Sequence, residues 1–353
     1  MKSVLCTLFS FNYMDKGLAL YESLERVAGD FVLYVLAMDD DCYAYLIDCG
    51  YAHMVPIRLS DFENEELLAA KQNRSFGEYC WTCSSPLIRY VLEAYQEPWC
   101  AYIDADMFFY ADPSVLFDEL ESRGGSVLLT GHRFSWYEKD RAEVVGHFCV
   151  EFNLFRNNPA ARGVLDKWIA QSLMACSSES GKDSFGDQKY LDGLTEAYDF
   201  VLETSHLGAG VAPWNVAQYR IVSHEKKGGY RLKCQGREVE LVFYHFAGIA
   251  YLDRFQADIG VYSYWGIDDR LVRSLYSDYL RVLDRYKQEV EEKTGRQILL
   301  KTHPAFSVKT TTLSGRLRST LSKLKRRAGR KRLLFVDLPK EVYKSRNLFR
   351  WEQ

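Results

Sequence analysis

The stretch from Trp99 to Phe117 constrains the fold more than any other part of the sequence. It begins with an apolar segment, 99–103, that is predicted to be a strand and that runs directly into Asp104 and Asp106. A strand that is apolar along its whole length is typical of a sheet covered on both faces. Two carboxylates at the end of such a strand are costly to bury unless a positive charge lies between them. A divalent cation bound by oxygen ligands is the natural compensation.

Apolar and helical segments alternate through roughly the first hundred residues, and this order predicts an α/β fold with a mostly parallel sheet and helices on both faces. Ligands bind such sheets at the carboxyl ends of the strands, where Ser10, Asp39 and Asp104 fall. The 353 residues suffice for one large domain with appendages or for two domains. The expected strands are 3–10, 31–38, 54–59, 99–103, 127–130, 148–155 and 238–246, the last ending near His245. The expected helices are 14–27, 42–49, 60–72, 84–95, 159–173 and 268–293.

Several polar residues lie in apolar surroundings and are candidates for a site. Glu151 and Asn153 lie two apart in the apolar strand 148–155, so they point to the same face. Arg89 lies among apolar residues of its helix and is expected either to meet Asp104, Asp106 or a phosphate, or to extend to the surface. Asp187 is positioned to cap a following helix.

The composition argues for a protein of a reducing compartment. The nine cysteines are scattered and odd in number, and the Cys80/Cys83 pair has no second pair with which to bind zinc, so all are predicted to be structural thiols. Residues 1–11 resemble a first core strand rather than a signal peptide. No apolar run reaches about 18 residues, so no membrane span is expected. These features predict a cytoplasmic protein.

The C-terminal part is basic although the whole chain has a formal net charge of −3. Residues 315–332 contain nine Lys or Arg and no acid, with Leu317, Leu321 and Leu324 at helical spacing. The segment 309–332 is therefore either a solvated tail or a basic amphipathic element attracted to an anionic membrane surface, which would make the protein peripheral on the inner face of the plasma membrane. No nucleic-acid-binding motif accompanies it.

Four features occur in a fixed order: Arg89, Asp104-x-Asp106, Gly186-Asp187-Gln188 and His245-Phe246-x-Gly248. This order resembles the retaining GT-A glycosyltransferases of the glycogenin and bacterial lipopolysaccharide galactosyltransferase superfamily, over residues 1–252. A bacterial branch with W-T-x-x-x-P and G-A-G-x-A-P-W-N is more similar still, and segments 81–86 and 208–215 match these motifs. The resemblance implies a GT-A catalytic domain at 1–265. The helical pattern at 268–293 and the basic residues after it predict a helical, basic extension at 266–353.

The resemblance also implies roles for single residues. Asp104, Asp106 and His245 would hold Mn²⁺ or Mg²⁺, and an imidazole beside two carboxylates suits Mn²⁺ better. Gly248 would let the backbone approach the donor diphosphate. The family's lysine after H-F-x-G is missing from 249–252, so Arg89, Lys71 or Lys189 is expected to replace it. The base and ribose would contact the end of the first strand and the second strand, at Thr7, Ser10 and Asp39, and Asp104 would lie near the ribose.

The implied reaction moves a sugar from a nucleotide diphosphate donor, most simply a UDP-sugar, to a glycan or glycolipid acceptor in bacterial surface polysaccharide synthesis. Glu151, Asp187 and Gln188 would lie near the anomeric carbon. We expect retention by same-face attack, in which the leaving phosphate oxygen takes the acceptor proton and Asp187 positions the donor sugar.

Three other protein classes compete with this interpretation. A haloacid-dehalogenase-type phosphatase also has D-x-D after a buried strand, and 186–192 fits its later G-D-x(4)-D; however, Met107-Phe108 departs from its first motif, which belongs on the first strand. A sugar-1-phosphate nucleotidyltransferase expects a Gly-rich basic loop where 10–13 lies. A non-catalytic sugar- or membrane-binding protein would need no set of metal ligands.

Overall fold

The computed structural model describes residues 2–177, 185–224, 229–253, 256–261, 266–298 and 348–350. The chain divides into two compact units. The first unit comprises Met1–Ala247 and Tyr264–Ile298, and the second comprises Gly248–Ser263 and Leu299–Gln353.

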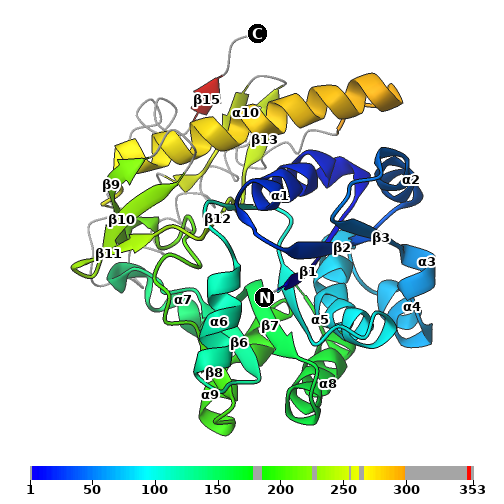
Figure 1. Cartoon of the computed structure of the whole chain (residues 1–353). Helices are drawn as coiled ribbons and strands as arrows, with labels where there is room; N and C mark the ends of the chain where they lie inside the picture. The colour runs from blue at the N-terminus through cyan, green and yellow to red at the C-terminus, as the bar shows by residue number, and fades with distance from the viewer. Residues whose placement is uncertain are drawn as a thin grey trace, which may run out of the picture. The chain divides into compact units, whose positions relative to one another are not determined.

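The first unit is built on a seven-stranded sheet with strand order β3-β2-β1-β4-β7-β6-β8 (Figure 1). Neighbouring strands run parallel except at β7, which is antiparallel to both β4 and β6. β1, β2 and β4 are buried at every residue, because the sheet is covered on both faces. The predicted α/β class with a mostly parallel sheet is confirmed. The strands are β1 (Ser3–Phe9), β2 (Phe31–Ala37), β3 (Met54–Arg58), β4 (Trp99–Ile103), β6 (Val127–Gly131), β7 (Phe148–Arg156) and β8 (Val201–Glu203).

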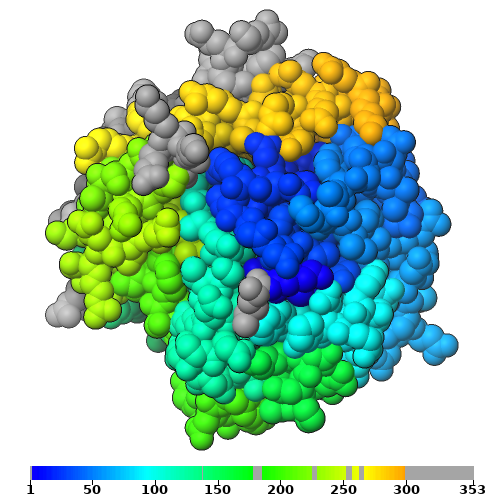
Figure 2. Space-filling model, viewed as in Figure 1, coloured from blue at the N-terminus to red at the C-terminus, as the bar shows by residue number. Residues whose placement is uncertain are grey.

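Helices cover the sheet on two sides. In Figure 1, α1 and α10 lie on one side of β1 and β2, and α5 and α8 lie on the other. The space-filling view shows the orange and yellow residues of α10 lying along the blue residues of α1 (Figure 2), and these two helices are in contact. The helices of this unit are α1 (Met14–Val27), α2 (Asp40–Cys49), α3 (Leu59–Phe62), α4 (Glu65–Lys71), α5 (Phe76–Ala94), α6 (Ser114–Ser122), α7 (Arg141–Val145), α8 (Pro159–Met174), α9 (Leu194–Ala197) and α10 (Asp269–Thr294), with short 3₁₀ turns η1 (Phe11–Tyr13), η2 (Trp136–Glu138), η3 (Gln188–Leu191) and η4 (Val216–Gln218).

Some predicted helix limits are wrong for identifiable reasons. The helix expected at 84–95 begins at Phe76, because Ser75 and Glu78 form a capping box that the sequence reading overlooked. Pro86 therefore lies in the middle of α5 rather than in its first turn. The helix expected at 60–72 is two helices, α3 and α4, and the side chain of Asn64 caps the second by accepting from the backbone of Leu67.

Two small sheets complete the first unit. β5 (Met107–Phe109) pairs antiparallel with β12 (Phe243–His245), and β9 (Arg220–His224), β10 (Tyr230–Cys234) and β11 (Arg237–Glu240) form an antiparallel meander. The Tyr230 hydroxyl is 3.0 Å from Asp278 Oδ2 on α10, which ties the meander to that helix. The β5–β12 pair matters most for function, since it brings a late part of the chain to the end of β4.

The second unit contains a three-stranded antiparallel sheet of β13 (Ala250–Asp253), β14 (Gln256–Asp258) and β15 (Leu348–Arg350). The basic segment 309–332 lies outside the described residues. Among the helices that the structure describes, none combines the length and the apolar character needed to span a bilayer.

Candidate metal centre

The turn between β4 and β5 carries Asp104 and Asp106. The Asp104 backbone N–H donates to the Glu151 carbonyl on β7 at 3.2 Å, and the Phe246 N–H donates to the Asp106 carbonyl at 2.8 Å. In the antiparallel pair of β5 and β12, Met107 lies opposite His245. The sheet therefore places the imidazole of His245 beside two carboxylates that are far from it in the sequence.

Asp104, Asp106 and His245, the three residues that the family resemblance implies as metal ligands, lie close together. His245 Nε2 lies 3.0 Å from Asp106 Oδ1 and 3.6 Å from Asp104 Oδ2. One ligand atom from each residue lies within 4.8 Å of the others, which is close enough for a single ion. The Asp106 and His245 side chains are almost fully buried, whereas the Asp104 side chain is 30% exposed and gives the cluster its access to solvent.

The charges in this cluster depend on one another. Burial raises the pKa of Asp104 to about 6. Burial also opposes ionisation of Asp106, but the charge of His245 and its hydrogen bond outweigh burial and lower the Asp106 pKa to about 2. Burial would lower the pKa of His245, yet the Asp106 carboxylate raises it well above its ordinary value. Without a metal, the imidazolium is thus the cation that the buried carboxylates require.

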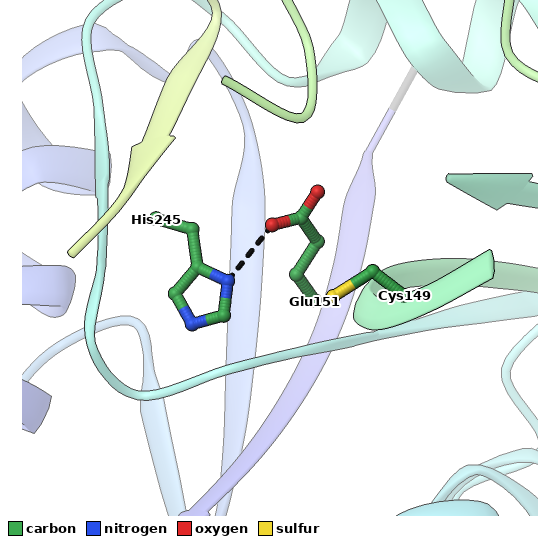
Figure 3. Close-up of side chains that lie close together, drawn as sticks. All are labelled: Cys149, Glu151 and His245. Atoms are coloured by element: carbon green, nitrogen blue, oxygen red, sulfur yellow. Dashed lines mark hydrogen bonds and ion pairs between the residues drawn. The ribbon is translucent and has the colours of Figure 1, made fainter. Parts of the chain in front are cut away.

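The second nitrogen of His245 also meets an acid. His245 Nδ1 lies 2.8 Å from Glu151 Oε2, and Figure 3 shows the two side chains pointing toward one another with Cys149 beside Glu151. Glu151 has no exposed surface, and its Oε1 atom has no hydrogen-bond partner among the described residues. Cys149, Glu151 and His245 form a second group that meets the distance requirement for an ion.

The loop 208–215, which matches G-A-G-x-A-P-W-N, holds the histidine in place. The His245 backbone N–H donates to the Val211 carbonyl at 2.9 Å, and the Trp214 ring lies edge-on to the imidazole with 5.4 Å between ring centroids. The Asn215 amide donates to the Gly210 carbonyl at 2.7 Å and to the His132 carbonyl at 2.9 Å. The loop 208–215 therefore holds the backbone and the ring of His245 in position.

A substitution at Gly210 tests how closely the loop 208–215 is packed. Its φ is +69°, and a Cβ there would lie 2.6 Å from Thr130 Cγ2 and 3.0 Å from Glu151 Oε1. We expect Gly210→Ala to lower the free energy of unfolding by about 2–4 kcal/mol, since it adds overpacking to backbone strain. Gly236→Ala is the matched control, because its φ is +77° but nothing lies within 4 Å of the added Cβ. Urea unfolding should show a loss of only about 1–2 kcal/mol for the control; equal losses in both variants would contradict crowding at Gly210.

Asp187 lies near this cluster but does not cap a helix as predicted. The side chain makes no cap hydrogen bond to η3; it accepts instead from the Ser84 hydroxyl on α5, while its backbone carbonyl accepts from Trp168 Nε1 at 2.8 Å. Burial raises the pKa of Asp187 to about 7, and the charge of Asp104 adds to the rise. The burial of its side chain in the folded protein outweighed the local capping preference.

The segment 81–86, which matches W-T-x-x-x-P, helps to place Asp187. The Trp81 ring lies against Gly186, where an added Cβ would be 3.6 Å from Trp81 Cε3. The neighbouring Gln188 uses its side-chain amide to donate to the Val145 carbonyl at 2.6 Å, at the end of α7. Trp81 and Ser84, both in the segment 81–86, therefore contact the Gly-Asp-Gln segment.

Two residues of the centre were missed by the sequence reading. The Tyr13 hydroxyl donates to Asp106 Oδ2 at 3.0 Å, and the Lys16 ammonium is buried 3.5 Å from the centroid of the Tyr13 ring. The charge of Lys16 contributes to the low pKa of Asp106. Their position just after the first strand was the available signal, since that strand end was already assigned to the site.

The residues assigned to the base and ribose lie within or just beyond the adjacent strands β1 and β2. Asp39 accepts from the Phe11 N–H at 2.9 Å and from the Cys42 N–H at 2.8 Å, so it joins the ends of β1 and β2 and caps α2. Thr7 and Ser10 are buried, and Thr7 Oγ1 has no hydrogen-bond partner among the described residues. Gly248 belongs to the second unit and has a φ of +83°.

The cations proposed to replace the missing lysine have other partners. Arg89 forms ion pairs with Glu93 and Asp166 at the surface, so the surface alternative is the one found, and a role beside Asp104 is not supported. Asp166 lies on α8, which packs on α5. The residue pattern of α5 alone does not reveal this partner of Arg89. Lys71 pairs with Glu63 at 2.6 Å, and Lys189 donates to the Glu143 and Val144 carbonyls.

Comparison with known proteins identifies relatives of the chain. The uncharacterized protein YfnF of Bacillus subtilis (strain 168) is 32% identical over 259 residues, which cover 70% of this chain and 82% of YfnF. The chain belongs to the YfnF family. The uncharacterized protein YfnD of the same organism is 29% identical to this YfnF-family chain over 289 residues, which cover 81% of the chain and 90% of YfnD. No protein-family model matches the chain.

Solved structures with which this YfnF-family chain aligns include three glycosyltransferases. LgtC with donor and acceptor sugar analogs has a TM-score of 0.47 at 15% identity, covering 86% of this chain and 98% of LgtC. The bifunctional glycosyltransferase WbbM has a TM-score of 0.48 at 12% identity, covering 84% of this chain and 52% of WbbM. Mouse xyloside xylosyltransferase 1 has a TM-score of 0.44 at 13% identity, covering 69% of this chain and 97% of that enzyme.

Proposed function

We propose that this YfnF-family protein is a metal-dependent glycosyltransferase. It takes a sugar from a nucleotide diphosphate donor, a UDP-sugar in the first instance, and passes it with retention to a glycan or glycolipid acceptor in surface polysaccharide synthesis. The observation that carries the proposal is the convergence of Asp104, Asp106 and His245 within 4.8 Å, at the carboxyl end of β4. Ligands of open α/β sheets bind at this edge.

The ligand atoms of Asp104, Asp106 and His245 suit a divalent cation. Two carboxylates and one imidazole nitrogen suit Mn²⁺, with Mg²⁺ as the alternative. The partly exposed Asp104 leaves a path for the ion and the diphosphate. Burial raises the pKa of Asp104, and the buried Glu151 Oε1 has no hydrogen-bond partner among the described residues, so these carboxyl groups lack a positive partner that a bound cation would supply. A bound ion there would neutralise the charge that grows on the departing diphosphate.

Other side chains are assigned to the donor sugar and to the nucleoside. Glu151 is wholly buried and bonded to His245, so we assign the donor sugar to Asp187 and Gln188. Asp187 is held by Ser84 and Trp168, which fixes its carboxyl group for hydrogen bonds to sugar hydroxyls. The acceptor hydroxyl attacks the anomeric carbon on the face that the diphosphate leaves, and its proton passes to the leaving phosphate oxygen. Thr7, Ser10 and Asp39 contact the nucleoside.

Thermal unfolding with nucleotide sugars, with and without Mn²⁺, tests the proposal. A donor at 100 times its dissociation constant should add about 2.7 kcal/mol to the free energy of unfolding. We expect the shift for one UDP-sugar only when Mn²⁺ is present. Release of phosphate from a phosphomonoester with Mg²⁺, and no response to any nucleotide sugar, would instead favour the phosphatase alternative.

Membrane attraction of the basic segment 309–332 is a separate part of the proposal. Its nine Lys or Arg in residues 315–332 should bind vesicles that contain anionic lipid, with each charge near the surface worth about 1 kcal/mol. Sedimentation of the full chain with such vesicles should fall as salt rises, and neutral vesicles serve as the control. Equal binding to both kinds of vesicle would contradict an electrostatic attraction.

A further inference from the structure

We propose that Glu151 is a positioning residue that fixes the orientation and tautomer of His245, so that Nε2 is the nitrogen that faces the ion. The inference rests on the proposed function, and it distinguishes between the two groups of potential ligands that share His245. One group lies at Nε2 with Asp104 and Asp106, and the other lies at Nδ1 with Cys149 and Glu151.

The contacts of His245 separate the two sides of its ring. At Nδ1, Glu151 Oε2 lies at 2.8 Å in a fully buried environment. At Nε2, Asp106 lies at 3.0 Å and the partly exposed Asp104 at 3.6 Å. Only the Nε2 side therefore has a ligand that solvent reaches, as an ion carrying a diphosphate requires.

The chemistry of imidazole then assigns the tautomer. A neutral imidazole has one N–H, and a carboxylate on one nitrogen holds the proton there and leaves a lone pair on the other. Carboxylates in this position behind metal-bound histidines also fix the ring and raise its basicity. Glu151 occupies this position, because it lies on β7 while the ion ligands lie on the β4–β5 turn and β12.

Cys149 completes the argument against an ion at Nδ1. Cys149 is itself buried, as Glu151 is, so neither ligand on this side of the ring is open to solvent. A thiolate, a carboxylate and an imidazole would favour a softer ion such as Zn²⁺. We therefore infer that Cys149 is not an ion ligand; its buried side chain lies beside Glu151 (Figure 3).

Mn²⁺ titration of the full chain by calorimetry tests the assignment. Glu151→Ala should weaken Mn²⁺ binding about 10–100-fold. Glu151→Gln should retain binding within a few-fold, since its amide oxygen can accept from Nδ1–H. The control Cys149→Ala, on the same face of β7, should bind Mn²⁺ like the wild type. Equal binding by Glu151→Ala and wild type, or a comparable loss in Cys149→Ala, would overturn the inference.

A measurement on the wild type avoids variants that fail to fold. Nitrogen NMR of ¹⁵N-histidine-labelled protein with saturating Mg²⁺, assigned with His245→Asn, should show a protonated Nδ1 and an unprotonated Nε2. The opposite tautomer would overturn the inference while leaving metal-dependent transfer intact. Failure of the wild type to bind Mn²⁺ would overturn both this inference and the proposed function.

Discussion

Asp106→Asn should lower sugar transfer about 10²–10³-fold, the scale of losing one electrostatic group that stabilises a transition state. Asn has the size of Asp and can still accept from His245 and meet the Tyr13 hydroxyl, so the protein should stay folded. It lacks the charge that binds a cation, and Mn²⁺ affinity should fall with activity. The readouts are UDP release from the UDP-sugar that gives the largest thermal shift, and Mn²⁺ calorimetry.

Asp166→Asn is the matched control for Asp106→Asn. Asp166 is half exposed and pairs with Arg89 on the surface between α5 and α8. Surface ion pairs contribute about 0–1 kcal/mol, so neither stability nor transfer should change appreciably. If Asp106→Asn keeps full transfer, or if the control loses as much, the metal centre described above is not the catalytic one.

The sequence identified the part of the site that is local in the chain. Asp104 and Asp106 were visible because an apolar strand that ends in two acids is unusual without a counter-charge. Asp39 was visible because it follows an apolar strand at the edge of the sheet where ligands bind; its capping of α2 was seen only in the structure. His245 was found only through the spacing of a family motif, since a histidine at a strand end has no periodic signal of its own.

The contacts made between distant segments could not be predicted. The Ser84 hydroxyl on Asp187 and the Glu151 carboxylate on His245 join positions whose proximity depends on the order of strands and the packing of helices. Helical spacing showed that Arg89 lay on a mostly apolar helix, but not that α8 would bring Asp166 to it. Sequence periodicity predicts which face of an element is buried, and the tertiary fold decides what covers it.

The second large effect concerns the pH dependence of stability at Asp187. Burial raises the pKa of this carboxyl to about 7 in the folded protein without metal, from the ordinary aspartate value of 3.8. Between these values the folded state retains a proton that the unfolded state has lost, so the free energy of unfolding falls as pH rises from about 4 to about 7. Below about pH 4 both states are protonated and the penalty is absent; above about pH 7 it is complete.

Asp187→Asn removes this penalty because an amide does not ionise. The difference in free energy of unfolding between the variant and the wild type should rise by about 2–4 kcal/mol in favour of the variant from pH 4 to pH 8. A change of one pKa unit corresponds to about 1.36 kcal/mol. Urea unfolding in EDTA between these pH values gives the measurement. Ser84→Ala should act in the opposite direction, because the Ser84 hydroxyl lowers the pKa of Asp187, and its loss should extend the fall in stability to higher pH. Parallel curves for wild type and Asp187→Asn would show that Asp187 is ionised at no unusual cost in the folded protein.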